Sequence, residues 1–174
     1  MKNKVISITR RRAEKTLFKL LIGRVFHITS FDSMLEIFKT GFIKNNRDKG
    51  LKLNWSSNSY FTNRGYVSVC DLFNNSKSRK IREAALSTYQ IFGQNWGPNT
   101  AFLFLNQASY SKLVTWEQVE SNKNDSYEII VPYLESGYPD QIPLKEISEI
   151  WVVNISDYIN YSDIFFENRT IIND

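Results

Sequence analysis

A chain of 174 residues with 42% apolar and 14% aromatic residues has enough apolar side chains for one globular domain, which excludes the disordered class. The net charge of +4 is unevenly divided, since residues 1–112 carry 19 Lys and Arg against 6 Asp and Glu, whereas residues 113–174 carry 3 against 12. The basic part suits a polyanion or a nucleotide, unless the acidic part simply neutralises it across the fold.

Several function classes are excluded by what the sequence lacks. One histidine, His27, and one cysteine, Cys70, cannot supply a zinc site or an internal disulfide, so no metal is expected. The motifs G-x-G-x-x-G, Walker A, H-E-x-x-H and G-x-S-x-G are missing. No apolar run reaches membrane-spanning length and no signal-peptide pattern opens the chain, so we expect a cytoplasmic protein without a membrane partner.

The N-terminal part of the single domain 1–174 is predicted to be a basic helix within residues 1–23. Its amphipathic pattern covers residues 8–22, with a leucine stripe on one face and Gly23 at its end. An ordinary surface helix with such a stripe is common, and contact with nucleic-acid phosphates is the functional alternative. Three side chains near its start are the candidates for that contact, namely Arg10, Arg11 and Arg12.

The next segment, 24–32, holds the single histidine in a short apolar run that is typical of a strand. Alternation places His27 and Thr29 on one face and Phe26 and Ile28 on the other. If the second pair faces the core, the imidazole and the hydroxyl are expected to face outward together.

A helix is predicted directly after this strand. Ser30 or Asp32 can cap its N-terminus, and Gly41 is suited to end it. A polar pair beside a helix N-terminus suits an anionic ligand. The alternative is a histidine that bonds to a backbone carbonyl near the edge of the core.

The middle of the chain is rich in basic, polar and aromatic residues. The loop 44–52 has three candidates for contact with a nucleic acid, namely Lys44, Arg47 and Lys49. The segment 55–66 combines rings, amides, hydroxyls and a cation, as a site for a nucleotide or a flat heterocycle requires, although a surface loop is equally compatible. Its candidate binding residues are Tyr60, Arg64 and Tyr66.

The remaining elements are mostly predicted strands. A strand at 66–70 and a helix at 76–92 come first, and further strands are predicted at 101–105, 113–116, 127–133 and 150–153. Residues 154–174 have enough apolar content to pack. The predicted class is α+β, with helices mostly in the N-terminal half and a mainly antiparallel, split sheet around a cleft.

Three pieces of sequence in this order resemble the ADP-ribosyltransferase superfamily, especially its small toxin-like branch, which includes DNA-thymidine ADP-ribosyltransferases. The first is Phe26-His27-Ile28-Thr29, followed by a short helix and a glycine. The second is the aromatic segment 60–66 with Arg64. The third is Glu135, followed by Pro143-Leu144-Lys145-Glu146-Ile147 and an aliphatic strand. Together they span about residues 24–153.

The resemblance implies a site for NAD as a substrate. By this resemblance His27 and Thr29 hold the nicotinamide ribose, Tyr60 or Tyr66 stacks on the nicotinamide, Arg64 meets the pyrophosphate, and Glu135 is the catalytic carboxylate. A carboxylate is suited to this chemistry, because cleavage of the nicotinamide–ribose bond builds oxocarbenium character. Glu128 and Glu117 compete with Glu135, and Arg47 competes with Arg64. No second polar residue that would orient an acceptor is evident before Glu135.

These observations lead to two function classes, and a third has less support in the sequence. The first is an enzyme that transfers ADP-ribose from NAD to a macromolecule, and the basic part of the chain suggests DNA or RNA as that macromolecule. Such an enzyme would act in a toxin, defence or phage–host conflict, with an antitoxin or a host protein as its partner. The second is a non-catalytic nucleic-acid or nucleotide-binding module, with Trp55, Tyr60 and Trp96 as stacking residues. The third is an effector that occupies the surface of a partner protein.

Overall fold

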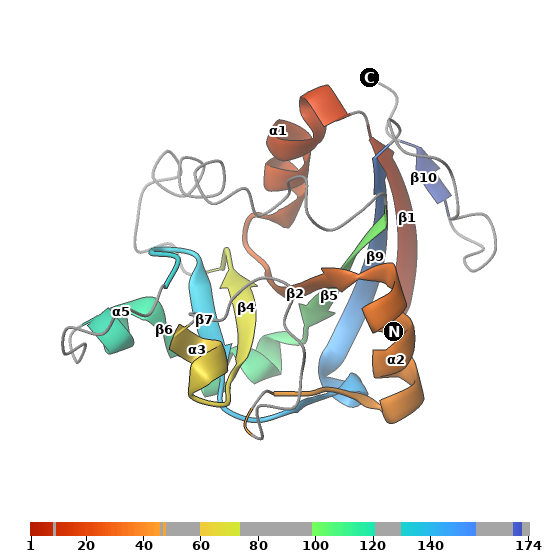
Figure 1. Cartoon of the computed structure of the whole chain (residues 1–174). Coiled ribbons are helices and arrows are strands. Elements are labelled where there is room, and N and C mark those ends of the chain that lie inside the picture. The colour runs from red at the N-terminus through yellow and green to blue at the C-terminus, as the bar shows by residue number, and fades with distance from the viewer. Residues whose placement is uncertain are drawn as a thin grey trace.

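An extended sheet with helices on both faces organises the residues that the computed structural model describes, which are 1–8, 10–45, 47, 60–73, 99–120, 130–155 and 169–171 (Figure 1). Its helices are α1 (Arg10–Leu21), α2 (Phe31–Thr40), α3 (Tyr60–Asn63) and α5 (Trp116–Glu120), with the 3-10 helices η1 (Gln107–Lys112) and η2 (Leu144–Glu146). Its strands are β1 (Lys2–Ile8), β2 (Val25–Ser30), β3 (Phe42–Ile43), β4 (Val67–Asp71), β5 (Asn99–Leu105), β6 (Val114–Thr115), β7 (Glu135–Tyr138), β8 (Ile142–Pro143), β9 (Ile147–Ile155) and β10 (Arg169–Ile171).

The main sheet has the strand order β10-β1-β9-β5-β2-β4-β7-β6. Strand β1 pairs in parallel with both β9 and β10, and the other pairs of this sheet are antiparallel. Strands β3 and β8 form a separate antiparallel pair. The α+β class and the mostly antiparallel sheet agree with the sequence-based prediction.

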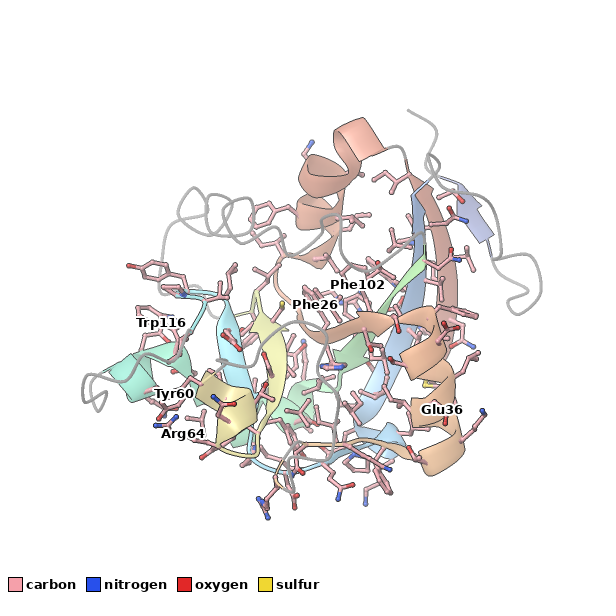
Figure 2. The ribbon with its side chains drawn as sticks, in the orientation of Figure 1. Phe26, Glu36, Tyr60, Arg64, Phe102 and Trp116 are labelled. Atoms are coloured by element: carbon pink, nitrogen blue, oxygen red, sulfur yellow. The ribbon has the colours of Figure 1, made fainter. Side chains whose placement is uncertain are left out.

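Each face of the sheet has its own core. Helix α1 buries Leu17 and Leu21 against a cluster around Phe26 and Phe102, whose ring centroids are 5.5 Å apart (Figure 2). Helix α2 covers the other face, where its Met34 joins a second cluster. Because both faces of β2 are therefore packed, the expectation that Thr29 faces outward is wrong. The Thr29 side chain is buried, and Val25 on the same face lies in the second cluster.

The predicted helix after β2 is confirmed at both ends. The Ser30 hydroxyl accepts a hydrogen bond from the Ser33 backbone nitrogen at 3.1 Å, so Ser30 rather than Asp32 is the N-cap. Gly41 ends the helix with φ 84°, a left-handed conformation in which only glycine has no Cβ penalty.

The N-terminal assignment needs a correction. Residues 2–8 form strand β1 rather than part of a basic helix, and the helix itself begins at Arg10. The strand exists because Val5, Ile6 and Ile8 are buried beside β9, a partner about 150 residues away along the chain. Local amphipathicity does not indicate such a partner.

A second correction concerns the residues before Glu135. A strand was predicted at 127–133, yet 132–134 form a turn in which Tyr133 has φ 65°, and β7 begins only at Glu135. Pro132 cannot donate to a strand ladder, and the Tyr133 ring instead packs edge-on against Trp116 at 4.5 Å. The predicted strand at 113–116 is likewise shortened to β6, because Trp116 begins α5.

Other predictions lie outside the described residues. They are the helix at 76–92, the candidate residues Lys49, Trp55, Trp96 and Glu128, and most of the tail after 155, of which β10 is described. For Arg10, Arg11 and Arg12 only the helical backbone is described. Within the described part of the chain, no helix has the length and apolar character needed to cross a bilayer.

Candidate active site where β2 and β4 separate

The sheet is held together at its centre by a very short pairing. Strands β2 and β4 pair at Val25–Asp71 and Phe26–Cys70, and outside the strands the Leu72 backbone nitrogen donates to the carbonyl oxygen of Arg24 at 2.9 Å. Beyond Phe26, β2 continues beside β5 as far as Ser30, while β4 continues beside β7 back to Val67. The two strands therefore extend in the same direction from their last shared pair without further pairing. They divide the sheet into a β2–β5–β9 half and a β4–β7–β6 half (Figure 1).

His27 is the first residue of β2 beyond this pairing. Its Nδ1 lies 3.0 Å from the carbonyl oxygen of Ser68 in β4, so Nδ1 carries the proton and donates. Burial lowers the pKa of the imidazole, although the bond to Ser68 acts in the opposite direction. The ring is therefore neutral at neutral pH, with Nε2 as its hydrogen-bond acceptor. A histidine in this state suits a hydroxyl ligand better than a phosphate.

Glu135 is the first residue of β7, and its side chain is buried with 9% exposure. Its Oε1 accepts from the Ser68 hydroxyl at 2.7 Å, and its Oε2 accepts from the backbone nitrogen of Val131 at 2.9 Å. Both of these donors are neutral groups, and the two bonds fix the orientation of the carboxylate. Ser68 thus contacts His27 through its carbonyl oxygen and Glu135 through its hydroxyl.

Cys70 lies directly opposite Glu135 in the β4–β7 ladder. Burial raises the pKa of its thiol far above the ordinary value, and the charges of Glu135 and Asp71 raise it further. Because only the thiolate is a good nucleophile, Cys70 is a packing residue, as its place in an apolar strand indicated.

The register shows which aromatic side chains share a face with Glu135. Residues 68 and 70 of β4 and residues 135 and 137 of β7 point to one side of the sheet. Phe61 of α3 packs on that side, since a Cβ added to Gly137 would lie 2.2 Å from the Phe61 ring. Tyr66, two residues before Ser68, meets the Phe61 ring edge-on at 5.8 Å. The Tyr60 ring also meets the Phe61 ring edge-on, at 5.4 Å between centroids, so both tyrosines flank Phe61.

Tyr60 is the first residue of α3, and Arg64 directly follows its last residue, Asn63. The Arg64 guanidinium stacks over the Tyr60 ring, 3.7 Å from its centroid (Figure 2). Arg64 is exposed.

His27 and Glu135 thus bond to the carbonyl oxygen and the hydroxyl of one residue, Ser68. Their side chains leave the sheet on opposite faces, because Glu135 lies on the face of Cys70 and Phe26 in the first core cluster, whereas His27 lies on the face of Val25 in the second. Tyr60 and Arg64 contact each other.

Lys44 and Arg47 are exposed on a loop that touches the segment after α3. The Arg47 guanidinium donates to the carbonyl oxygen of Pro139 at 3.4 Å. The Arg47 Cβ would lie 3.1 Å from a Cβ added to Gly65, which has φ 76°. Arg47 therefore packs beside the residue that follows Arg64, and the two cations belong to one surface.

The competing carboxylates differ in position. Glu117 lies in the first turn of α5, beyond the edge strand β6, whereas Glu135 bonds to the residue that also contacts His27. Sequence reasoning missed Ser68, although a serine alternating with valines in a strand was a usable signal. Among the residues that the structure describes, no group of three or more His, Cys, Asp or Glu could hold a metal ion.

Comparison of the chain with models of protein families, with curated proteins and with solved structures finds no match in any of the three.

Proposed function

We propose that the protein is an NAD-dependent enzyme with an ADP-ribosyltransferase-like fold that transfers ADP-ribose to a macromolecule. The observation that carries the proposal is the arrangement of His27 and Glu135 on the two sides of Ser68, where β2 and β4 separate. The order of the sequence pieces and the split of the sheet between the histidine strand and the glutamate strand support it further.

Each residue has a role that follows from its chemistry. Nε2 of the neutral His27 accepts a hydrogen bond from a ribose hydroxyl, and Thr29, two residues further along β2, supports that ribose. The carboxylate of Glu135 stabilises the positive charge that develops on the sugar as the bond from C1′ to the nicotinamide nitrogen breaks. Nicotinamide leaves with the electron pair, and the acceptor forms the new bond to C1′ and gives its proton to the carboxylate.

Tyr66 is better supported than Tyr60 as the aromatic partner of nicotinamide. Both tyrosine rings stand edge-on against the buried Phe61, but the Arg64 guanidinium already stacks over the Tyr60 ring at 3.7 Å. Arg64 and Arg47 are the candidates for the pyrophosphate, whose oxygens match the planar donor fork of a guanidinium. Arg64 would have to leave the Tyr60 ring to reach it.

The acceptor is proposed to be a nucleic acid, because exposed cations lie next to the start of β4, the strand that holds Ser68. Lys44, Arg47 and Arg64 are exposed, and the last two meet at Gly65. A cytoplasmic enzyme of this kind would act in a toxin, defence or phage–host conflict, with an antitoxin or a host protein as its partner.

Labelled NAD tests the proposal. The protein is incubated with NAD and with DNA, RNA or cell extract, and both label transfer and nicotinamide release are measured. Glu135→Gln keeps the size of the side chain, removes its charge and replaces one acceptor oxygen by an NH2 donor, and we expect it to lower both rates about 100-fold or more. Glu117→Gln is the matched control and should retain activity. Equal rates for wild type and Glu135→Gln would end the proposal.

A non-catalytic nucleic-acid-binding module is the second candidate. The surface formed by Lys44, Arg47 and Arg64 favours it, with the stacked Tyr60 as a platform for a base. A titration with single-stranded DNA across salt concentrations separates the two functions. Binding with a steep salt slope but no nicotinamide release would favour the module, and a flat slope would exclude charge-driven binding.

A further inference from the structure

A second polar cluster, away from His27, joins the end of β7 to the start of β9. Lys112 Nζ donates to Glu146 Oε1 at 2.6 Å and to the Tyr138 hydroxyl at 3.1 Å. The Tyr138 hydroxyl in turn donates to Glu146 Oε2 at 2.6 Å. The three side chains therefore form a closed set in which each one bonds to the other two.

This cluster is defined by burial as well as by geometry. Tyr138 is only 4% exposed and the Glu146 side chain is 14% exposed, whereas the Lys112 side chain covers them from the surface and is 47% exposed. Burial and the bond to Glu146 raise the pKa of Tyr138, so it remains a donor. Burial also acts to raise the pKa of Glu146, but bonds from Lys112, Tyr138 and Ser109 outweigh it and lower the pKa. The cluster thus holds one fixed pattern of donors and acceptors.

The anchor for this cluster belongs to the β2–β5–β9 half. Glu146 immediately precedes β9, and its carbonyl oxygen accepts from the backbone nitrogen of Asn106 at 2.8 Å. Asn106 also donates through its side chain to the carbonyl oxygen of Lys145 at 2.9 Å, and it directly follows β5. Strands β5 and β9 pair along most of their length, so this end of the cluster is firmly placed.

The other end of the cluster belongs to the β4–β7–β6 half. Tyr138 is the last residue of β7, which begins with Glu135, about 10 Å away along an extended strand. In the ladder with β4, Glu135 lies opposite Cys70 at the shared junction with β2, and Tyr138 lies opposite Val67 at the far end. The halves are therefore joined at the junction by strand pairing and at the far end by the cluster.

We propose that Lys112, Tyr138 and Glu146 are positioning residues that fix the separation of the two halves of the sheet, and with it the spacing between His27 and Glu135. The claim about chemistry rests on the proposed function, whereas the claim about separation does not. Apolar residues of the second core also span the halves, so the polar bonds matter for position more than for overall stability.

The test compares Tyr138→Phe, which removes only the hydroxyl, with Glu149→Gln as a matched control. Glu149, whose side chain is 23% exposed, pairs with Arg24 at 2.5 Å, and both residues belong to the β2–β5–β9 half. Backbone hydrogen exchange is measured at residues 67–71 and 135–138 in the full chain. We expect Tyr138→Phe to speed exchange there about tenfold, as loss of one buried hydrogen bond does, and Glu149→Gln to leave it unchanged.

NAD turnover supplies the second measurement. Loss of the Tyr138 hydroxyl from the cluster should lower kcat about tenfold while KM for NAD stays within about twofold, because the position of the carboxylate matters most in the transition state. Lys112→Arg keeps the charge and should behave as the wild type, and Glu146→Gln replaces Tyr138→Phe if that variant does not fold. Equal exchange in the Tyr138 and Glu149 variants would overturn the proposal. Absence of NAD turnover in the wild type would overturn the proposed function alone, because backbone hydrogen exchange still tests whether the cluster holds the two halves of the sheet.

Discussion

Substitution of Ser68 by alanine removes the hydroxyl that bonds to Glu135 and leaves the carbonyl oxygen that bonds to His27. The lost bond is 2.7 Å long and ends on a carboxylate with 9% exposure. Hydrogen bonds to charged groups contribute about 1.5–3 kcal/mol, so we expect the free energy of unfolding to fall by that amount. At about 2–4 °C per kcal/mol for a chain of this size, Tm falls by about 3–12 °C.

Ser136→Ala is the matched control for this prediction. Ser136 follows Glu135 in β7 and is 1% exposed, and its hydroxyl bonds to the buried Asp71 at 3.4 Å. A bond of that length is weak, so the expected loss is about 0–1 kcal/mol. Urea unfolding followed by tryptophan fluorescence measures both variants, and the slope with urea should not change.

The result that would refute the reasoning is equal stability of the two serine variants. The imidazole signals of His27 give an independent check by NMR, since its carbonyl partner is retained in Ser68→Ala. Unchanged imidazole signals together with the larger loss of stability would place the effect at Glu135. Shifted signals would mean that the backbone of β4 has moved.

Three further predictions concern the same region. Gly137→Ala places a Cβ 2.2 Å from the Phe61 ring and should cost about 1–3 kcal/mol in urea unfolding, with partial recovery when Phe61→Leu is added. The lowered pKa of His27 means that the folded state favours the neutral ring, so stability should fall as the pH drops below 6.5, and His27→Asn should flatten this dependence in unfolding experiments across pH. Tyr66→Ala should weaken NAD binding about tenfold in calorimetry, whereas Tyr60→Ala should change it less than threefold.

Helix α2 shows what the sequence predicts well. Its start depends on Ser30 and its end on Gly41, and both residues act within four positions along the chain. The apolar alternation in β2 is equally local, and Phe26 and Ile28 do share one core cluster. Such signals can be read from sequence because cause and effect lie in one short segment.

The missed elements depend on partners that are distant along the chain. Strand β1 is stabilised by β9, and β7 begins where it does because the turn at Tyr133 reverses the chain before Glu135. No periodicity within residues 2–8 or 127–133 indicates these partners. The same limit applies to the site, since Ser68 becomes notable only through the register that places it between β2 and β7.

The separation of β2 from β4 explains why the candidate site depends on so few contacts. In a fully paired sheet the carbonyl oxygen of Ser68 would bond to a neighbouring strand, and no side chain could reach it. Because the pairing stops at Phe26 and Cys70, the His27 ring takes the place of that strand. This arrangement requires only two particular residues, one histidine and one serine. It also requires that the distance between the two halves of the sheet is fixed. Under the proposed function the Glu135 carboxylate must be placed to within about 0.5 Å, so both proposals require the bonds made by Ser68 and by Tyr138 together.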